Sequence, residues 1–184
     1  MIKYILLMEV VEMAKMTSSY ANKVLRKLQE DKEFWVNKEN EEFVYVAALD
    51  EEPVIPEYDY KAVADTIEEI DEKIVRIKHA INVVNTTNEI QVGNKKMSID
   101  TILVRMAQLN KRKAVLDRMR KLQPKTRINT SSYYAQRKSV PEYRYINYDL
   151  NLIKKEYEIV DTEISEMQIA LDKFNQTFEF EVEL

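Results

Sequence analysis

Apolar residues recur at alternating spacings of four and three in two long stretches of the chain. The first holds Val63, Ile67, Ile70, Ile74, Ile77, Ile81 and Val84, and the second holds Leu150, Ile153, Tyr157, Val160, Ile164, Met167, Leu171 and Phe174. This heptad keeps a narrow apolar seam facing another helix in a left-handed supercoil. It predicts two long helices with the interface residues Ile67, Ile70, Ile74, Ile77, Ile81, Ile153, Tyr157, Val160, Ile164 and Met167.

Weaker patterns predict two further helices. A less regular apolar stripe predicts a helix over residues 1–30, beginning at about Lys3. Another stripe predicts a helix over residues 98–123, because Ser98 is a suitable N-cap and Pro124 cannot continue a helix.

The ends of the heptad stretches carry their own signals. Asp59 and Asp149 precede the two stretches and are expected to be N-caps. Gly93, the only glycine, lies in a Val-Gly-Asn-Lys turn sequence that reverses the chain. Residues 59–123 are therefore predicted to form an antiparallel helical hairpin.

Three short segments have the composition of strands. Residues 43–46 are rich in β-formers, and so are residues 143–148. Residues 178–184 alternate apolar side chains with glutamates, which is typical of a half-buried strand. The three segments predict a small sheet at one end of the helices.

These elements together predict a mainly α fold. It is a long antiparallel helical hairpin or coiled-coil bundle of about four helices, with a small β-sheet at one end. Residues 1–184 are expected to form a single elongated domain. Its segments are a helix over 1–30, a strand-containing connector over 31–58, a helical hairpin over 59–123, a basic and tyrosine-rich connector over 124–148, and a helix with a terminal strand over 149–184.

The heptad seams can be closed in two ways. They can pack on each other within one chain, or they can pack against a second copy. Elongated hairpins leave apolar surface that another chain can cover, so a homo-oligomer or a protein partner is expected alongside the intramolecular alternative.

Charge is distributed unevenly along the chain. Residues 111–145 hold eleven Lys and Arg against two acids, and residues 30–72 hold sixteen acids against three lysines, whereas the net charge of the chain is −4. One interpretation is nucleic-acid or acidic-partner binding through Arg112, Arg118, Arg120, Lys121, Arg127, Tyr134, Arg137 and Lys138. The alternative is neutralisation by the protein's own acidic segments, within one chain or between copies, which the acidic pI of about 5.3 favours.

The sequence offers little for catalysis. Walker-type loops, dinucleotide fingerprints and nucleophile elbows need more than the single glycine of this chain. There is no cysteine, and the one histidine, His79, falls on the outer side of its heptad helix. We therefore predict a non-enzymatic protein with no catalytic residues, metal or cofactor.

A polar cluster marks the end of the first heptad helix. Asn82, Asn85 and Asn88 are spaced by three and lie along one side of it. Their amides could set the register of a helix pair or bind a ligand.

The surrounding sequence resembles the septicolysin-like family of small bacterial proteins. The similar residues are the run over 81–88, then Gly93, then Met97-Ser98 opening a helix with Arg105 and Leu109. Leu171-Asp172 and Asn175-Gln176-Thr177 are similar to the closing segment of that family, whereas Met106 replaces the aspartate that follows its arginine. The resemblance implies a mainly helical fold, and the family name implies membrane activity as a third alternative.

The chain has no apolar run of the roughly 18 residues that a membrane span needs. Glu9 and Glu12 interrupt the apolar N-terminus, which therefore does not resemble a signal peptide. A cytoplasmic protein is expected. The leading prediction is an oligomeric helical scaffold or protein-interaction module.

Overall fold

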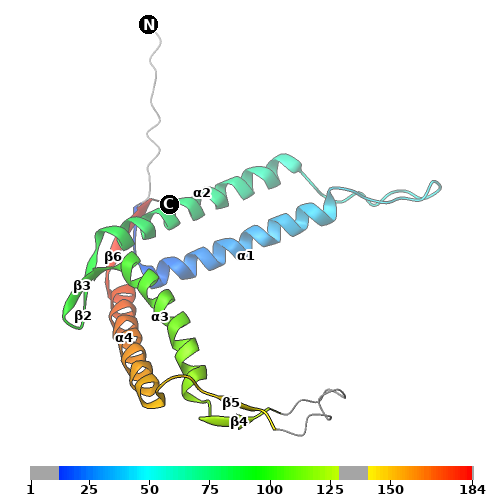
Figure 1. Cartoon of the computed structure of the whole chain (residues 1–184). Helices are drawn as coiled ribbons and strands as arrows, with labels where there is room; N and C mark the ends of the chain where they lie inside the picture. The colour runs from blue at the N-terminus through cyan, green and yellow to red at the C-terminus, as the bar shows by residue number, and fades with distance from the viewer. Residues whose placement is uncertain (1–12, 129–140, 184) are drawn as a thin grey trace. The chain divides into compact units, whose positions relative to one another are not determined.

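The computed structural model describes residues 13–128 and 141–183. These residues form four α-helices and six β-strands (Figure 1). In chain order the elements are β1 (Met13–Thr17), α1 (Ser18–Glu42), α2 (Tyr60–Thr87), β2 (Glu89–Val92), β3 (Lys95–Ser98), α3 (Ile99–Arg120), β4 (Lys125–Arg127), β5 (Tyr143–Tyr145), α4 (Leu150–Thr177) and β6 (Glu179–Glu183). The predicted mainly α fold with a small β component is confirmed.

The chain divides into two compact units. Within the described residues, unit 1 holds residues 13–88 and 172–183, and unit 2 holds residues 89–128 and 141–171. The strands form three antiparallel two-stranded sheets: β1 with β6, β2 with β3, and β4 with β5. The predicted single sheet is therefore three separate ones, because each strand has one described partner.

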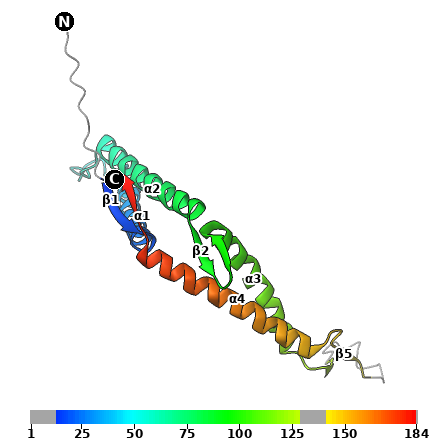
Figure 2. The same cartoon turned by 90° about the vertical axis from the view of Figure 1, so that its left-hand side faces the viewer.

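Unit 1 is an antiparallel pair of helices closed at one end by a sheet. The side chain of Lys32 on α1 contacts both carboxylate oxygens of Asp71 on α2 at 2.6 Å. Toward the sheet, Ile77 is fully buried in a cluster that includes Phe180 and Val182 of β6. Figure 2 shows β6 beside β1, the strand with which it pairs. The predicted alternating strand is thus confirmed over Glu179–Glu183, with one face buried, and Leu184 lies outside the described residues.

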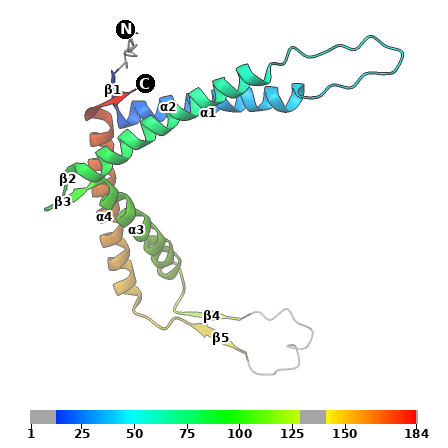
Figure 3. The ribbon, with the colours of Figure 1, turned by 90° about the horizontal axis from the view of Figure 1, so that it is seen from above.

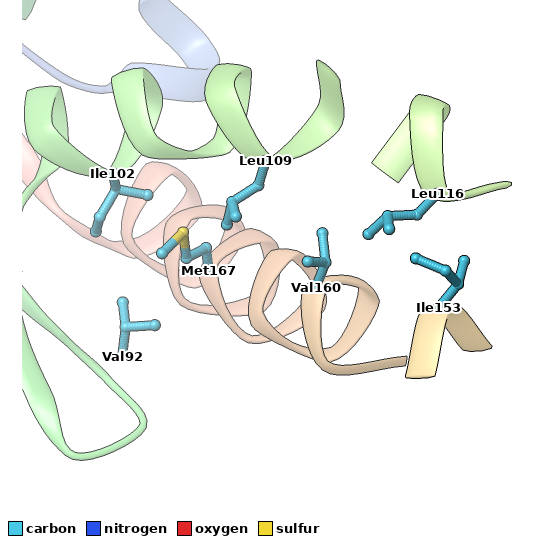
Figure 4. Packing of buried hydrophobic residues seen from close by; sticks show 7 residues of the cluster. All are labelled: Val92, Ile102, Leu109, Leu116, Ile153, Val160 and Met167. Carbon is cyan, nitrogen blue, oxygen red and sulfur yellow. The ribbon is translucent and has the colours of Figure 1, made fainter. Parts of the chain in front are cut away.

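Unit 2 repeats this architecture with α3, α4 and the β2–β3 hairpin. Buried residues recur every seven positions on both helices, as a heptad requires. They are Ile102, Leu109 and Leu116 on α3 and Ile153, Val160 and Met167 on α4, with Val92 from β2. Figure 4 shows the six helix side chains directed toward one another between α3 and α4, with Val92 beside them on the side of the β-hairpin. Arg105 on α3 also makes a two-pronged ion pair with Glu163 on α4.

The two halves of the chain repeat one β-α-α-β motif. Helices α2 and α4 each have 28 residues, and they begin at Tyr60 and Leu150, 90 positions apart. In the first half the order is β1, α1, α2, β2, and in the second it is β3, α3, α4, β6 with β4 and β5 inserted between the two helices. The last strand of each half pairs with the first strand of the other half. The registers correspond as well, since Thr17 pairs with Glu179 just as its equivalent Ser98 pairs with Glu89.

Individual contacts follow the same correspondence. The ion pair of Lys32 with Asp71 has its equivalent in that of Lys113 with Asp161, displaced by 81 and 90 positions. A tyrosine before each second helix bonds the end of the first: the Tyr58 hydroxyl donates to Glu39, and 90 positions later the Tyr148 hydroxyl donates to the Met119 carbonyl. The two halves therefore have equivalent internal contacts as well as the same topology.

Two of the three predicted N-caps bond amides of their helices, whereas Ser98 is the N-cap residue of α3 but makes no side-chain cap hydrogen bond. Asp59 accepts hydrogen bonds from the amides of Lys61 and Ala62 at the start of α2. Asp149 accepts equivalent bonds from Asn151 and Leu152 at the start of α4. Both N-caps were predicted, and each satisfies amides that have no partner within the helix.

Three sequence predictions differ from the structure. Residues 43–46 form no strand, because β-forming side chains need a neighbouring strand and these have none among the described residues. Within the predicted helix over 1–30, residues 13–17 form β1, and α1 begins at Ser18 and continues to Glu42; residues 1–12 lie outside the described range. Within their units, α2 packs on α1 and α3 packs on α4, whereas α2 and α3 were expected to pair.

Candidate interaction surfaces

The heptad seams are buried within the chain. Of the predicted interface residues, Ile70, Ile74, Ile77, Ile153, Val160 and Met167 are buried, and Ile67, Ile81, Tyr157 and Ile164 are half-buried. Each seam faces the other helix of its own hairpin. The surfaces that remain available to a partner therefore lie elsewhere.

The connection between α1 and α2 is an exposed apolar segment, which we call the arm (residues 43–58). Figure 3 shows it extending beyond the ends of the two helices. Seven of its residues are large, apolar and exposed: Phe43, Val44, Tyr45, Val46, Leu49, Val54 and Ile55. Val46, Leu49 and Val54 are each at least 90% exposed. The arm also carries Asp50 and three glutamates and no lysine or arginine, so its net charge is −4.

The base of the arm is held to the helices. The Tyr58 hydroxyl donates a hydrogen bond of 3.0 Å to the Glu39 carboxylate. Partial burial and this bond raise the pKa of Tyr58 above its usual value. The amide of Phe43 bonds the carbonyl of Glu39 at 3.0 Å, so both ends of the arm meet at one residue of α1. The arm is thus anchored at its root, and its apolar side chains project into solvent.

A groove of about 780 Å³ adjoins the root of the arm on the same hairpin. Its apolar lining includes Ala64, Ile67 and Val75, and Tyr60 lies at the end nearest the arm. Its polar residues are mostly acidic: Glu39, Glu68, Asp71 and Glu72, with Arg76. The groove and the arm therefore form one surface that combines apolar and acidic groups.

The connection between α3 and α4 contains a basic two-stranded sheet formed by β4 and β5. We call this sheet, residues 125–127 and 143–145, the ribbon. Its six residues are exposed and include Lys125, Arg127 and Arg144 but no acid. The register places Lys125 opposite Tyr145 and Arg127 opposite Tyr143, so two cations and two rings share one face. The ammonium of Lys125 lies 4.2 Å from the Tyr143 ring centre and 5.5 Å from that of Tyr145.

The structure separates the predicted basic residues into two groups. Arg120 and Lys121 both contact Asp117, at 2.8 and 2.5 Å, and Arg120 also stacks 3.8 Å from the Tyr157 ring centre. Hydrogen bonds from Lys121 and Arg120 hold the pKa of Asp117 below its usual value. These two cations are therefore paired locally with an acid of the basic stretch itself, and the predicted neutralisation by the acidic segments stays a prediction.

The other predicted basic residues lie elsewhere. Arg112, Arg118 and Arg127 are exposed, and Tyr134, Arg137 and Lys138 lie outside the described residues. Among the predicted basic residues that the structure describes, Arg127 lies in the ribbon with Lys125 and Arg144. The predicted basic residues are not gathered into a single site within the described part of the chain.

The asparagine cluster lies at the end of α2. Asn88 is the C-cap residue, and its side-chain amide donates to the carbonyl of Val84 and to the Thr87 hydroxyl. Asn82 is exposed and Asn85 is half-buried. Of the cluster, Asn88 thus has a local capping role. His79 is exposed, as its heptad position predicted.

Metal binding and membrane spanning find no support among the described residues. No group of three or more His, Cys, Asp or Glu side chains there is placed to hold a metal ion. Among the same residues, none of the helices combines the length and apolar composition needed to cross a bilayer.

Sequence reasoning missed the arm as a surface. Its β-forming residues favoured a strand. The signals for an exposed segment are Pro53, Pro56 and the four acidic residues among the sixteen positions of the arm. The basic, tyrosine-rich composition of residues 124–148 was noticed, but the pairing of β4 with β5 depends on a contact between the two ends of that connector.

Comparison with known proteins adds a fold but no activity. No family model and no curated protein matches the chain, so the septicolysin-like resemblance stays a prediction. One similar solved structure is described as that of a functionally unknown conserved protein from Corynebacterium diphtheriae. It is 14% identical, the match covers 91% of this chain and 99% of that one, and the TM-score is 0.61. At this identity the similarity shows a shared fold alone.

Proposed function

We propose that this protein is a non-enzymatic helical scaffold that assembles with further copies of itself. The arm is the observation that supports this proposal. An exposed apolar segment is unfavourable in water unless a partner covers it, since burial stabilises by about 25 cal/mol for each Å² of apolar surface. Seven large exposed hydrophobic residues in sixteen consecutive positions form a larger apolar patch than the isolated ones that any surface carries.

The remainder of the molecule suits a scaffold. Both helix hairpins have their own heptad cores, so the arm and the groove are presented on elements that do not depend on a partner for their packing. The groove beside the arm adds apolar and acidic surface to it. A chain without cysteine suits a reducing compartment, and we place the scaffold in the cytoplasm.

The test is the absolute mass of the full chain by size-exclusion chromatography with light scattering. A multiple of 21.8 kDa is expected for the wild type. The variant V46Q/L49Q/V54Q removes apolar surface from the arm and should reduce the mass. A matched control, V104Q/L152Q/I169Q, changes three exposed apolar residues on helices and should keep the wild-type mass. A wild type that stays at the single-chain mass at every concentration would overturn the proposal.

Nucleic-acid binding is the second candidate, and the ribbon favours it. Two exposed tyrosines lie beside Lys125, Arg127 and Arg144. Cations and aromatic rings of this kind bind the phosphates and bases of single-stranded nucleic acid. Fluorescence anisotropy with a labelled single-stranded oligonucleotide tests this. Binding that weakens steeply with salt and disappears in K125E/R127E/R144E is expected for this candidate. No binding at low ionic strength would eliminate it.

A further inference from the structure

The repeat places the arm and the ribbon at equivalent positions. The arm joins α1 to α2, and the segment containing the ribbon joins α3 to α4. The interiors of the two halves are similar, because ion pairs, N-caps and strand registers recur at constant displacements. The connections are not similar: one has sixteen residues and a net charge of −4, and the other carries the ribbon with three cations.

Equivalent positions with opposite charge form a complementary pair. The arm provides four carboxylates next to seven exposed apolar side chains. The ribbon provides three cations, together with Tyr143 and Tyr145, whose rings are exposed. Tyrosine rings are well suited to cover apolar side chains while their hydroxyls stay hydrated. Both the apolar and the charged groups of the arm therefore have matching groups on the ribbon.

We propose that the arm of one copy docks on the ribbon of a second copy, so that copies associate head to tail. The proposal rests on the proposed function and adds the two surfaces that meet. Each copy then contributes its arm to one interface and its ribbon to another, so the interface is heterologous. Such an interface builds rings or open chains rather than symmetric dimers.

Within its own unit, each surface lies at the end of the helix pair that is away from the sheet. The chain passes between the units at residues 88–89 and 171–172, which lie at the sheet end of each hairpin. The arm and the ribbon lie at the other end of their hairpins. At 1.5 Å per residue, the helices put roughly 30–40 Å between each surface and those connections. Each surface therefore stands clear of the sheet end of its own unit.

Charge reversal tests the proposal on the full chain. The variant D50K/E51K/E52K makes the arm basic, and K125E/R127E/R144E makes the ribbon acidic. Each variant alone should run at the single-chain mass, because its two surfaces then carry like charges. An equimolar mixture of the two should regain higher mass, because each variant is complementary to the other. A chain with both reversals should also assemble by itself, which shows that neither change prevents folding.

Three further measurements accompany the charge-reversal experiment. E33K/E69K/E158K reverses three exposed acids outside the arm and should keep the wild-type mass. Wild-type assembly should weaken as salt rises from about 0.05 to 0.5 M, because exposed charges are screened beyond roughly 10 Å already at 0.1 M. Circular dichroism checks that every variant keeps its helices.

The outcomes separate this inference from the proposed function. If the wild type assembles but neither reversal changes its mass, the docking of arm on ribbon is wrong and the scaffold proposal stands. If the doubly reversed chain behaves as the wild type but the mixture of single reversals does not assemble, the two surfaces pair within one chain, which also overturns head-to-tail docking. If the wild type never assembles, both proposals fail.

Discussion

Leu116 provides the sharpest test of how the seams are closed. Its side chain on α3 is fully buried and faces Ile153 on α4 (Figure 4). Replacing Leu116 with alanine removes three carbon atoms from this contact. Because the surrounding helices relax only in part, most of that volume becomes a cavity.

The expected loss follows from burial. At about 0.8 kcal/mol for each buried methylene, three carbons are worth about 2.4 kcal/mol. The cavity adds to this, so Leu116→Ala should lower the free energy of unfolding by about 3 kcal/mol, within the usual range of roughly 2–5 for buried leucines. Leu103 on the same helix is 45% exposed. Leu103→Ala should cost about 1 kcal/mol, since part of its surface is already in water and no closed cavity forms.

Urea unfolding followed by far-ultraviolet circular dichroism measures both variants. The experiment is repeated over a hundredfold range of protein concentration. A seam closed within the chain gives the same Leu116→Ala loss at every concentration, because association through the arm and ribbon is the same for both proteins and cancels in the difference. The reasoning is refuted if Leu116→Ala costs no more than Leu103→Ala, or if the loss depends on concentration.

Three further predictions concern local contacts. Gly93 has φ +52°, and an added Cβ would stand 3.1 Å from a carboxylate oxygen of α4, so Gly93→Ala should destabilise by about 1 kcal/mol in thermal unfolding; an unchanged melting temperature would contradict this. Asp59→Ala and Asp149→Ala each remove an N-cap and should each cost about 1 kcal/mol in urea, with serine restoring most of it; unequal costs would argue against equivalent caps in the two halves. The folded-state pKa of Asp117 is lowered, so its ionised form stabilises the fold above its ordinary value of 3.8, and this stabilisation is lost as the pH falls through the folded value. Between about pH 5 and 2 the wild type should therefore lose more thermal stability than Asp117→Asn, and parallel curves would exclude the effect.

The buried helix seams and part of one candidate surface could be predicted from the sequence. The seam residues were identified because a heptad places its apolar side chains on one side of a helix whatever the partner is. The cations of the ribbon were visible in the composition. The arm was not recognised, because Val44 and Val46 have the same β propensity whether they are paired in a sheet or exposed to solvent.

The sequence by itself determined the elements whose signals are local. Two heptads, the capping residues Asp59 and Asp149, and the turn at Gly93 specify where helices run and where the chain reverses, because each depends on neighbours within a few residues. Only the tertiary structure decided the partners. A heptad seam indicates which face of a helix is buried but not which helix covers it. The pairing of α2 with α1 and of α3 with α4 depends on contacts between distant residues, such as that of Lys32 with Asp71. The return of β6 to β1 joins residues more than 150 positions apart in the same way, and no local pattern specifies it.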